Sequence, residues 1–325
     1  MFTNQTGIPV ALAVWLATDN YDHNIDPMTI SATSLLKPVR QIILSSRIQS
    51  QSKIDIASLL ASRMGTAIHD SIEKAWIENY ESAFKSLGYP DRAISRIRIN
   101  PELSDLGEDD IPIYLEKRSE RKIDGFTITG KFDFVIEGRV EDFKSTGTYT
   151  YMTKSKDQDY ILQASIYRWL NPEIITADDM RIHFIFTDWK ALDAKLQKDK
   201  GYPQSKTLEY PLRLMSLQET EHWIKRKLQE IQKYWSSDDL DIPFCTDEQL
   251  WRTPPVFKYY KDPNKRTRST KNFDNAAEAY LRLTQEGGKG IVVEAGGEVK
   301  ACRYCSAFEI CKQKDMYLAD GSLII

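Results

Sequence analysis

The sequence predicts an α/β protein in which a mixed sheet lies between layers of helices. One observation is the order of the periodic segments, because helical and strand patterns that alternate along a chain are typical of such sandwiches. A second is size: 325 residues, 41% of them hydrophobic, are enough to bury a sizeable core. A third is the crowding of cysteines after residue 300, which predicts a cysteine-rich C-terminal extension. The expected parts are an N-terminal segment (1–55), a core (56–240) and an extension (241–325).

The formal net charge of −3 says little about partners, since a nucleic-acid enzyme can concentrate positive charge locally. The early apolar run from Ile8 to Ala17 is too short to cross a bilayer. It also lacks the preceding basic residues of a signal peptide, so a buried helix or strand is expected there. We therefore expect a soluble, cytoplasmic protein with no membrane partner.

The first strong pattern is helical and runs from Ile54 to about Phe84, after a mixed N-terminal segment. Five of its residues recur every three or four positions and would lie along one stripe: His69, Ile72, Glu73, Trp76 and Tyr80. Strands are then predicted over 128–136, 139–144 and 181–187, with helices over 160–170 and 217–235. Residues 101–112 read as an acidic loop, and residues 188–209 as a polar excursion from the core.

The strands before and after Glu137-Gly138 form a predicted hairpin, because glycine favours the second position of a two-residue turn. This turn pairs Phe134 with Glu141 and Asp133 with Asp142. Alternation along the strands then gives two faces. One carries Phe132, Phe134, Ile136 and Phe143, and the other carries Asp133, Asp142 and Lys144.

The polar face of this hairpin suits phosphodiester hydrolysis. Two opposed carboxylates repel each other, but a bound divalent cation reverses the sign of that interaction. Mg²⁺ or Mn²⁺ held by Asp133 and Asp142 would bind a phosphate and lower the pKa of a water molecule. Lys144 would stabilise the negative charge that develops in the reaction. The alternative is a solvated polar face on an amphipathic hairpin.

Two helical pairs accompany the hairpin. His69 and Glu73 share one face four residues apart, in a helix that contains Gly65-Thr66, and Gln163 and Tyr167 do the same after the hairpin. On these residues alone, a core or surface histidine and a packing pair are alternatives to a functional role.

Taken in order, Gly65-Thr-x-x-His69, Gly130-x-x-Asp133, Asp142-x-Lys144 and Gln163-x-x-x-Tyr167 resemble the PD-(D/E)XK nuclease superfamily, and most closely its RecB-like exonuclease branch. The resemblance implies a restriction-endonuclease-like core and a metal-dependent deoxyribonuclease. It implies metal ligation by His69, Asp133, Asp142 and the Phe143 carbonyl, catalysis by Lys144, and support from Gln163, Tyr167 and Glu73.

An exonuclease acting on single- or double-stranded DNA ends is expected, with a recombination protein as a further partner. An endonuclease of the same fold and a catalytically silent DNA-binding module are the alternatives.

The cysteines form a compact ligand run, Cys302-x2-Cys305-x5-Cys311, to which Cys245 can add a fourth thiolate. Four thiolates suit zinc or an iron–sulfur cluster. The spacing resembles the C-terminal cluster of iron–sulfur RecB-type nucleases, including AddB-like and CRISPR-adaptation enzymes, and implies a [4Fe-4S] cluster, with structural Zn²⁺ as the alternative. In those enzymes the first cysteine usually precedes the nuclease core, whereas here none precedes Cys245. Buried free cysteines remain a third alternative.

Between Cys245 and Cys302, basic residues alternate with aromatic ones, a pattern that fits phosphate contacts and base stacking. The predicted DNA contacts are Arg252, Lys258, Tyr259, Lys261, Lys265, Arg266 and Arg268. An ordinary strand pair with a solvated basic turn is the alternative. Gly287-Gly-Lys-Gly290 lacks the first glycine and the Ser/Thr of a phosphate loop, so no ATPase is expected.

Overall fold

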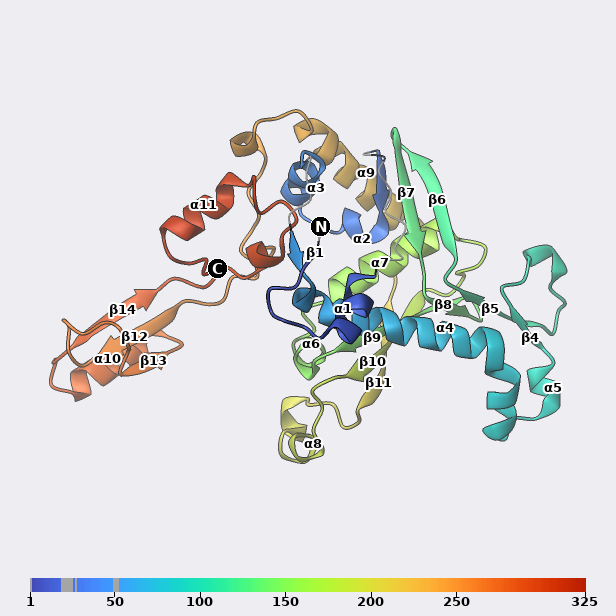
Figure 1. Cartoon of the computed structure of the whole chain (residues 1–325), viewed down its shortest axis with the longest axis horizontal. Coiled ribbons are helices and arrows are strands. Elements are labelled where there is room, and N and C mark those ends of the chain that lie inside the picture. Colours follow the sequence, from blue (N-terminus) through green and yellow to red (C-terminus); the bar gives the residue numbers. More distant parts are fainter. Residues whose placement is uncertain (1, 19–25, 27, 49–52) are drawn as a thin grey trace. The chain divides into compact units, whose positions relative to one another are not determined.

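The computed structural model describes residues 2–18, 26, 28–48 and 53–325, which form two compact units (Figure 1). Unit 1 comprises Met1–Leu36 and Ser50–Leu228, and unit 2 comprises Lys37–Gln49 and Gln229–Ile325. The three-part division by function, at 55/56 and 240/241, stays a prediction.

The helices and strands lie as follows. The helices of unit 1 are α1 (Val10–Ala17), α2 (Ala32–Leu35), α4 (Leu60–Ser86), α5 (Asp91–Ile94), α6 (Thr148–Thr153), α7 (Asp157–Leu170) and α8 (Ala191–Leu196). Its strands are β1 (Phe2–Thr3), β2 (Thr29–Ser31), β3 (Ile54–Asp55), β4 (Ile97–Ile99), β5 (Ile111–Leu115), β6 (Arg118–Ile123), β7 (Phe126–Lys131), β8 (Phe134–Ile136), β9 (Arg139–Thr146), β10 (Asp179–Phe186) and β11 (Thr207–Arg213). Helix α9 (Leu217–Tyr234) begins in unit 1 and ends in unit 2. Unit 2 further contains α3 (Val39–Ser46), β12 (Val256–Tyr260), β13 (Lys271–Phe273), α10 (Ala276–Gln285), β14 (Ile291–Ala295) and α11 (Lys312–Ala319).

A six-stranded mixed sheet forms the centre of unit 1, in the order β11-β10-β9-β8-β5-β4. Strands β9 and β10 are parallel, as are β4 and β5, and the other neighbours are antiparallel. The predicted α/β class and mixed sheet are confirmed. The predicted pairing of Phe134 with Glu141 is confirmed, whereas Asp133, predicted to pair with Asp142, lies just before β8 and outside this ladder.

Helices cover both faces of this sheet. On one face, Phe134 and Phe143 pack with Trp76 of α4, which runs across β9 (Figure 1). On the other face, Phe184 of β10 contacts the ring of Tyr160 in α7. Burying an aromatic side chain of this size stabilises the fold by about 1.5–3 kcal/mol, so both helices are fixed to the sheet by apolar contacts.

The predicted strand 128–136 is wrong in one respect, because it is two strands. Strand β7 ends at Lys131 and pairs with β2 and β6 in a separate three-stranded sheet, whereas β8 begins at Phe134 and joins the central sheet. The chain therefore changes sheets at Phe132 and Asp133. Phe132 is fully buried but does not belong to the cluster of Phe134, which corrects its predicted place on that face.

The apolar N-terminal run forms α1, but most of its side chains are not buried as predicted. Val10 is 78% exposed and Val14 65%, and of the helix only Leu16 is buried. Helix α1 contacts the turn at Ile56–Leu59, so only one side of it is covered. Within the described residues, no helix has the length and apolar character needed to cross a membrane.

Strand β11 was not predicted, because residues 207–209 were assigned to a polar excursion and residues 210–213 to no element. It lies at the edge of the sheet and alternates between exposed and half-buried side chains. Pro211 is tolerated there because an edge strand leaves one row of backbone groups unpaired. Helix α8 precedes it in the same polar stretch.

The described residues of unit 2 include two small apolar clusters. One, built on the antiparallel sheet β13-β12-β14 and α10, buries Tyr259, Phe273 and Ala279. The other centres on Leu250, Val299 and Leu323, and two cysteines pack against it.

Candidate metal and nuclease site

The central strand β9 places Asp142 and Lys144 on one face of the sheet, as predicted. Because side chains alternate along a strand, residues two apart point the same way. The Nζ of Lys144 lies 2.6 Å from Oδ2 of Asp142, and the Asp142 side chain is only 7% exposed. The carboxylate and the ammonium group therefore form a buried ion pair.

Burial and neighbouring charges perturb this pair. Burial raises the pKa of Asp142, the negative charge of Asp133 adds to this, and Lys144 opposes it. Burial alone would lower the pKa of Lys144, but the charges of Asp142 and Asp133 outweigh it and the pKa is raised. Lys144 is thus held as a cation, with its Nζ 5.7 Å from the ring centre of Tyr160. Burial also raises the pKa of Tyr160 to about 12.

His69 of α4 reaches the point where the chain changes sheets. Its Nδ1 lies 3.3 Å from Oδ2 of Asp133, and its Nε2 lies 2.8 Å from the carbonyl oxygen of Phe143. The hydrogen bond with Asp133 raises the pKa of His69. Burial would raise the pKa of Asp133, but its contacts with His69 and the charge of Lys144 prevail and lower it. The structure thus brings these three predicted ligand groups together.

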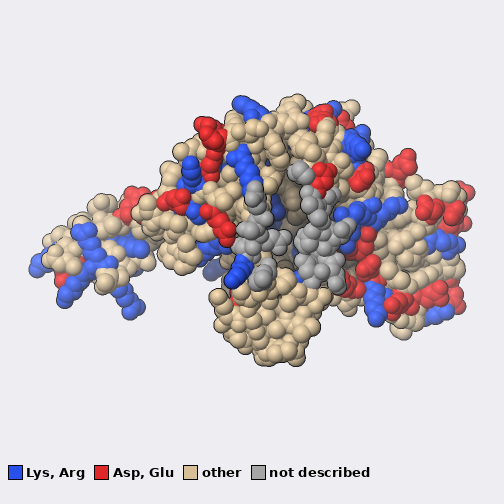
Figure 2. Space-filling view, turned by 45° about the horizontal axis from the view of Figure 1, so that its top comes forward, with Lys and Arg blue, Asp and Glu red and all other residues tan. Residues whose placement is uncertain are grey.

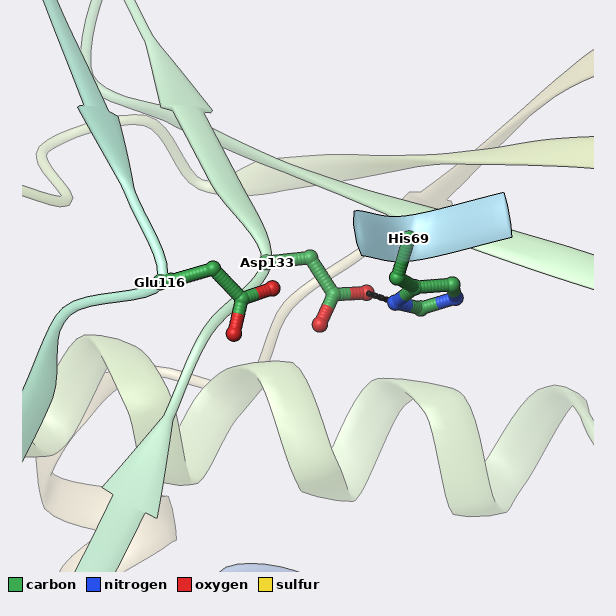
Figure 3. A group of neighbouring side chains, drawn as sticks. All are labelled: His69, Glu116 and Asp133. Atoms are coloured by element: carbon green, nitrogen blue, oxygen red, sulfur yellow. Dashed lines mark ion pairs between the residues drawn. The ribbon is translucent and has the colours of Figure 1, made fainter. Parts of the chain in front are cut away.

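Glu116 joins this group, although the sequence pattern did not reveal it. Figure 3 shows the carboxylate of Asp133 between the carboxylate of Glu116 and the imidazole of His69. Ligand atoms of the three residues all lie within 4.8 Å of one another, so they could hold a metal ion. Glu116 also forms an ion pair with Lys131, and burial raises its pKa against the effect of that lysine.

The backbone of Glu116 is unusual as well. Its φ of +50° lies in the left-handed region, which is uncommon for a residue with a side chain. Its N–H donates to the carbonyl of Asp133 at 3.1 Å, which fixes the two residues side by side. Glu73, predicted as a support, lines a small cavity together with His69 and Glu116.

The carboxylate oxygens at this site fit a divalent cation. Oδ2 of Asp133 and Oδ2 of Asp142 are buried, and neither accepts a well-directed hydrogen bond from the described residues, despite the short contacts with His69 and Lys144. A buried polar atom without such a bond costs about 1–3 kcal/mol, and more when charged. Mg²⁺ and Mn²⁺ prefer oxygen ligands, so a bound cation would satisfy such an oxygen. Asp133 belongs to the group whose ligand atoms all lie within 4.8 Å of one another, whereas Asp142 does not.

Gln163 and Tyr167 lie on α7, where their visible contacts are structural. Gln163 Nε2 donates to Oγ1 of Thr33 at 2.9 Å. Tyr167 is 7% exposed and packs so closely on Gly130 that a Cβ there would lie 2.9 Å from its ring. The residue of α7 that approaches Lys144 is Tyr160. A catalytic role for Gln163 or Tyr167 stays a prediction.

The four cysteines are gathered at one place in unit 2, and none forms a disulfide. Each thiol is half-buried, and the other three sulfurs all contribute to the electrostatic environment of Cys245. Burial, followed by the neighbouring sulfurs, raises the pKa of Cys245 to about 12 and that of Cys302 to about 11. Neighbouring cysteines that form no disulfide are the donor type of zinc and iron–sulfur sites, so this donor set fits such a metal. No three of the four sulfurs lie within 4.8 Å of one another.

The buried side chain of Gln313 in α11 fixes Cys245 relative to that helix. Its Oε1 accepts from the Cys245 N–H at 2.8 Å, and its Nε2 donates to the Cys245 carbonyl at 3.0 Å. Cys311 directly precedes the same helix. The distant cysteine is thereby held beside the C-terminal run.

The predicted DNA contacts divide into two groups. Exposed basic side chains follow β12, and Figure 2 shows Lys and Arg gathered on this part of unit 2; they are Lys261, Lys265, Arg266 and Arg268. Lys258 is half-buried on β12. Arg252 pairs with Asp247 at 3.1 Å and lies over the ring of Tyr317.

Tyr259 is a correction. Its side chain is fully buried, and its hydroxyl donates to the carbonyl of Lys289 at 2.8 Å. A ring in the core of the β12–β14 sheet cannot stack on a base. At Tyr259 the alternation of basic and aromatic residues therefore arises because this side chain points into the core from β12.

No protein-family model matches the sequence, and no curated protein is detectably similar to it. Among solved structures, the chain is similar to SSO0001, with 15% identity and a TM-score of 0.36 over 73% of this chain and 89% of that one. It is also similar to a phage-related exonuclease from Haemophilus somnus 129PT, with 18% identity and a TM-score of 0.27 over 64% of this chain and 93% of that one. At these scores, neither likeness says anything further about this chain.

Proposed function

We propose that this chain is a metal-dependent DNA nuclease of the PD-(D/E)XK type. The observation that carries the proposal is the pair of buried Asp133 and Asp142 oxygens that accept no well-directed hydrogen bond, with His69 and the cationic Lys144 beside them. A buried carboxylate pair next to a lysine is costly as a purely structural feature. It is useful where a cation and a phosphate must be held together.

Each residue has a role in this proposal. Asp133, Asp142, the Phe143 carbonyl and His69 hold Mg²⁺ or Mn²⁺, and Glu116 is a further ligand that would exchange its ion pair with Lys131 for the cation. The metal ion, when bound, orients the scissile phosphate and lowers the pKa of a water molecule. Lys144 stays protonated beside Asp142 and stabilises the negative charge that develops on the phosphate.

The substrate in this proposal is a DNA end, which makes the enzyme an exonuclease. The basic side chains between β12 and β13 contribute nonspecific phosphate contacts. An endonuclease of the same fold is the alternative within this chemistry. A cytoplasmic location and a recombination partner are part of the same proposal.

The experiment that tests this function uses two DNA substrates. End-labelled linear DNA and covalently closed circular DNA are incubated with the protein, with Mn²⁺ and with a chelator. Loss of the label from linear DNA only, and only with Mn²⁺, supports the exonuclease. Cleavage of both substrates supports an endonuclease, and no cleavage of either supports a silent DNA-binding module.

The cysteines form a structural metal site in this proposal. A [4Fe-4S] cluster is favoured by the resemblance of the spacing, and Zn²⁺ is the alternative. Either would cross-link the segment at Cys245 to the C-terminal run. Protein purified without oxygen would be brown with iron and sulfide in the first case, and colourless with zinc in the second.

A further inference from the structure

A fully buried arginine lies beside the cysteines of unit 2. Arg40 in α3 is 2% exposed. Removing a guanidinium group from water costs several kcal/mol unless charge and hydrogen bonds replace the water. Its partners therefore indicate what the group does.

The two outer nitrogens of Arg40 interact with two backbone carbonyls and one carboxylate. Nη1 donates to the carbonyl oxygens of Asp239, at 2.8 Å, and Ile242, at 3.0 Å. Nη2 forms an ion pair with the Asp239 carboxylate. The guanidinium carbon also lies 5.1 Å from the ring centre of Phe244.

The remaining donor points at a sulfur. Nε of Arg40 donates to Sγ of Cys311 at 3.2 Å, across 271 residues of sequence. A neutral thiol is a weak acceptor, whereas a hydrogen bond from a cation to an ionised partner is about twice as strong as a neutral one. The buried cation of Arg40 therefore directs a charged donor at the sulfur of Cys311.

Asp239 completes a closed network with the same cysteine. Its Oδ2 accepts from the N–H of Lys312 at 3.1 Å, and Lys312 follows Cys311 in the first turn of α11. Asp239 thus orients Arg40 and fixes the backbone next to the sulfur. Among the described residues of unit 2, the buried polar side chains are Arg40 and Gln313, and each contacts a cysteine.

We propose that Arg40 is a positioning residue of the cysteine metal site, which holds Sγ of Cys311 in place as a ligand. This inference rests on the proposed metal site at the cysteines.

The test compares Arg40, inside α3, with Arg47, the residue that directly follows the last turn of this helix. Arg47 donates to the carbonyls of Trp235, at 2.7 Å, and Ser237, at 2.8 Å, so Arg47→Gln is a matched control that leaves the contact with Cys311 in place. Wild type, Arg40→Gln and Arg47→Gln are purified without oxygen. Iron, sulfide and zinc are counted per chain, and the half-life of metal release to an excess of chelator is measured.

Arg40→Gln should release the metal at least about tenfold faster than wild type, since a hydrogen bond to a charged group contributes about 1.5–3 kcal/mol and tenfold is about 1.4 kcal/mol. Arg47→Gln should resemble wild type. The unfolding temperature should fall more in the loaded than in the metal-free Arg40→Gln protein. An equal fall in both, or equal release from both variants, would show that Arg40 only packs α3 and would overturn the proposal.

Arg40→Lys covers the case in which Arg40→Gln does not fold. Lysine keeps the cation beside Asp239 but has no second donor in line with Cys311, so metal release should again be fast. Wild-type retention of metal by Arg40→Lys would contradict the proposal. Wild-type protein that binds no metal at the cysteines would overturn the cysteine site and the role of Arg40 together, whereas the nuclease site is read separately by DNA cleavage.

Discussion

Nδ1 of His69 lies 3.3 Å from Oδ2 of Asp133, and the other ring nitrogen lies 2.8 Å from the carbonyl of Phe143. The imidazole thus sits between two oxygens that are also proposed metal ligands. Because both contacts are with oxygens, they favour the protonated ring in the metal-free protein and raise the pKa of His69. A metal ion needs a nitrogen lone pair, so proton and metal compete for His69.

This competition gives a pH dependence. The pKa of His69 is raised in the folded, metal-free protein, so its stabilising effect is complete below the unfolded value of about 6.5 and is lost as the pH rises through the folded value. His69→Asn should therefore lower the free energy of unfolding more at about pH 6 than at about pH 9. Urea unfolding in a chelator measures this. An equal loss at both pH values would contradict the ion pair.

Metal binding should show the opposite trend with pH. Mn²⁺ should bind wild type more tightly as the pH rises, because fewer molecules carry a proton on His69 that the metal must displace. His69→Asn should need more Mn²⁺ for half-maximal cleavage. An unchanged Mn²⁺ titration would make His69 a packing residue.

Glu116→Gln tests the ligand that the sequence did not reveal. Loss of one carboxylate should raise the Mn²⁺ concentration for half-maximal cleavage several-fold, because an amide is a weaker ligand. Glu120→Gln, at an exposed position on β6, is the control and should change nothing. Identical titrations for the two variants would remove Glu116 from the site.

Two glycines of the predicted motifs should respond in opposite directions to alanine. A Cβ on Gly130 would lie 2.7 Å from Leu170 and 2.9 Å from Tyr167, so Gly130→Ala should lower the free energy of unfolding by about 1–3 kcal/mol. A Cβ on Gly65 meets only Ser145 Oγ at an ordinary 3.5 Å. Gly65→Ala, inside α4, should be neutral or stabilising by up to about 1 kcal/mol. Urea unfolding separates the two, and a stable Gly130→Ala protein would refute the tight packing of α7 on β7.

Cys305→Ser tests the cross-link in unit 2. Losing one metal–thiolate bond should make residues from Cys245 to the C-terminus sensitive to protease, because metal binding contributes folding free energy. The carboxylates of unit 1 should still bind Mn²⁺. Wild-type protease resistance in that segment would rule out the cross-link.

Local patterns predicted much of the site correctly. The Glu137-Gly138 turn fixed the register of Phe134 with Glu141, and strand alternation placed Asp142 with Lys144. Helix α9 begins at Leu217 as predicted, because its apolar period is strong. These features depend on residues close in sequence.

What the sequence did not reveal depends on distant pairing. Glu116 meets Asp133 only because β5 pairs with β8, and no local pattern encodes that pairing. The break at Phe132 has the same cause, since β7 and β8 have different neighbours. The local sequence does not decide whether Tyr259 is exposed or buried. Its strand β12 lies between β13 and β14, and the side chain is buried in that sheet's core.

The most direct measurement of the nuclease proposal is Mn²⁺-dependent cleavage of end-labelled linear DNA by Lys144→Ala, beside Lys122→Ala on exposed β6 as control. Removing the cation next to Asp142 leaves the carboxylates free to bind Mn²⁺, so metal and DNA binding should persist. Cleavage should fall by at least about 100-fold, because Lys144 acts on charge that develops in the transition state. The Lys122→Ala protein should cleave like wild type. Wild-type cleavage by Lys144→Ala would contradict the proposed site.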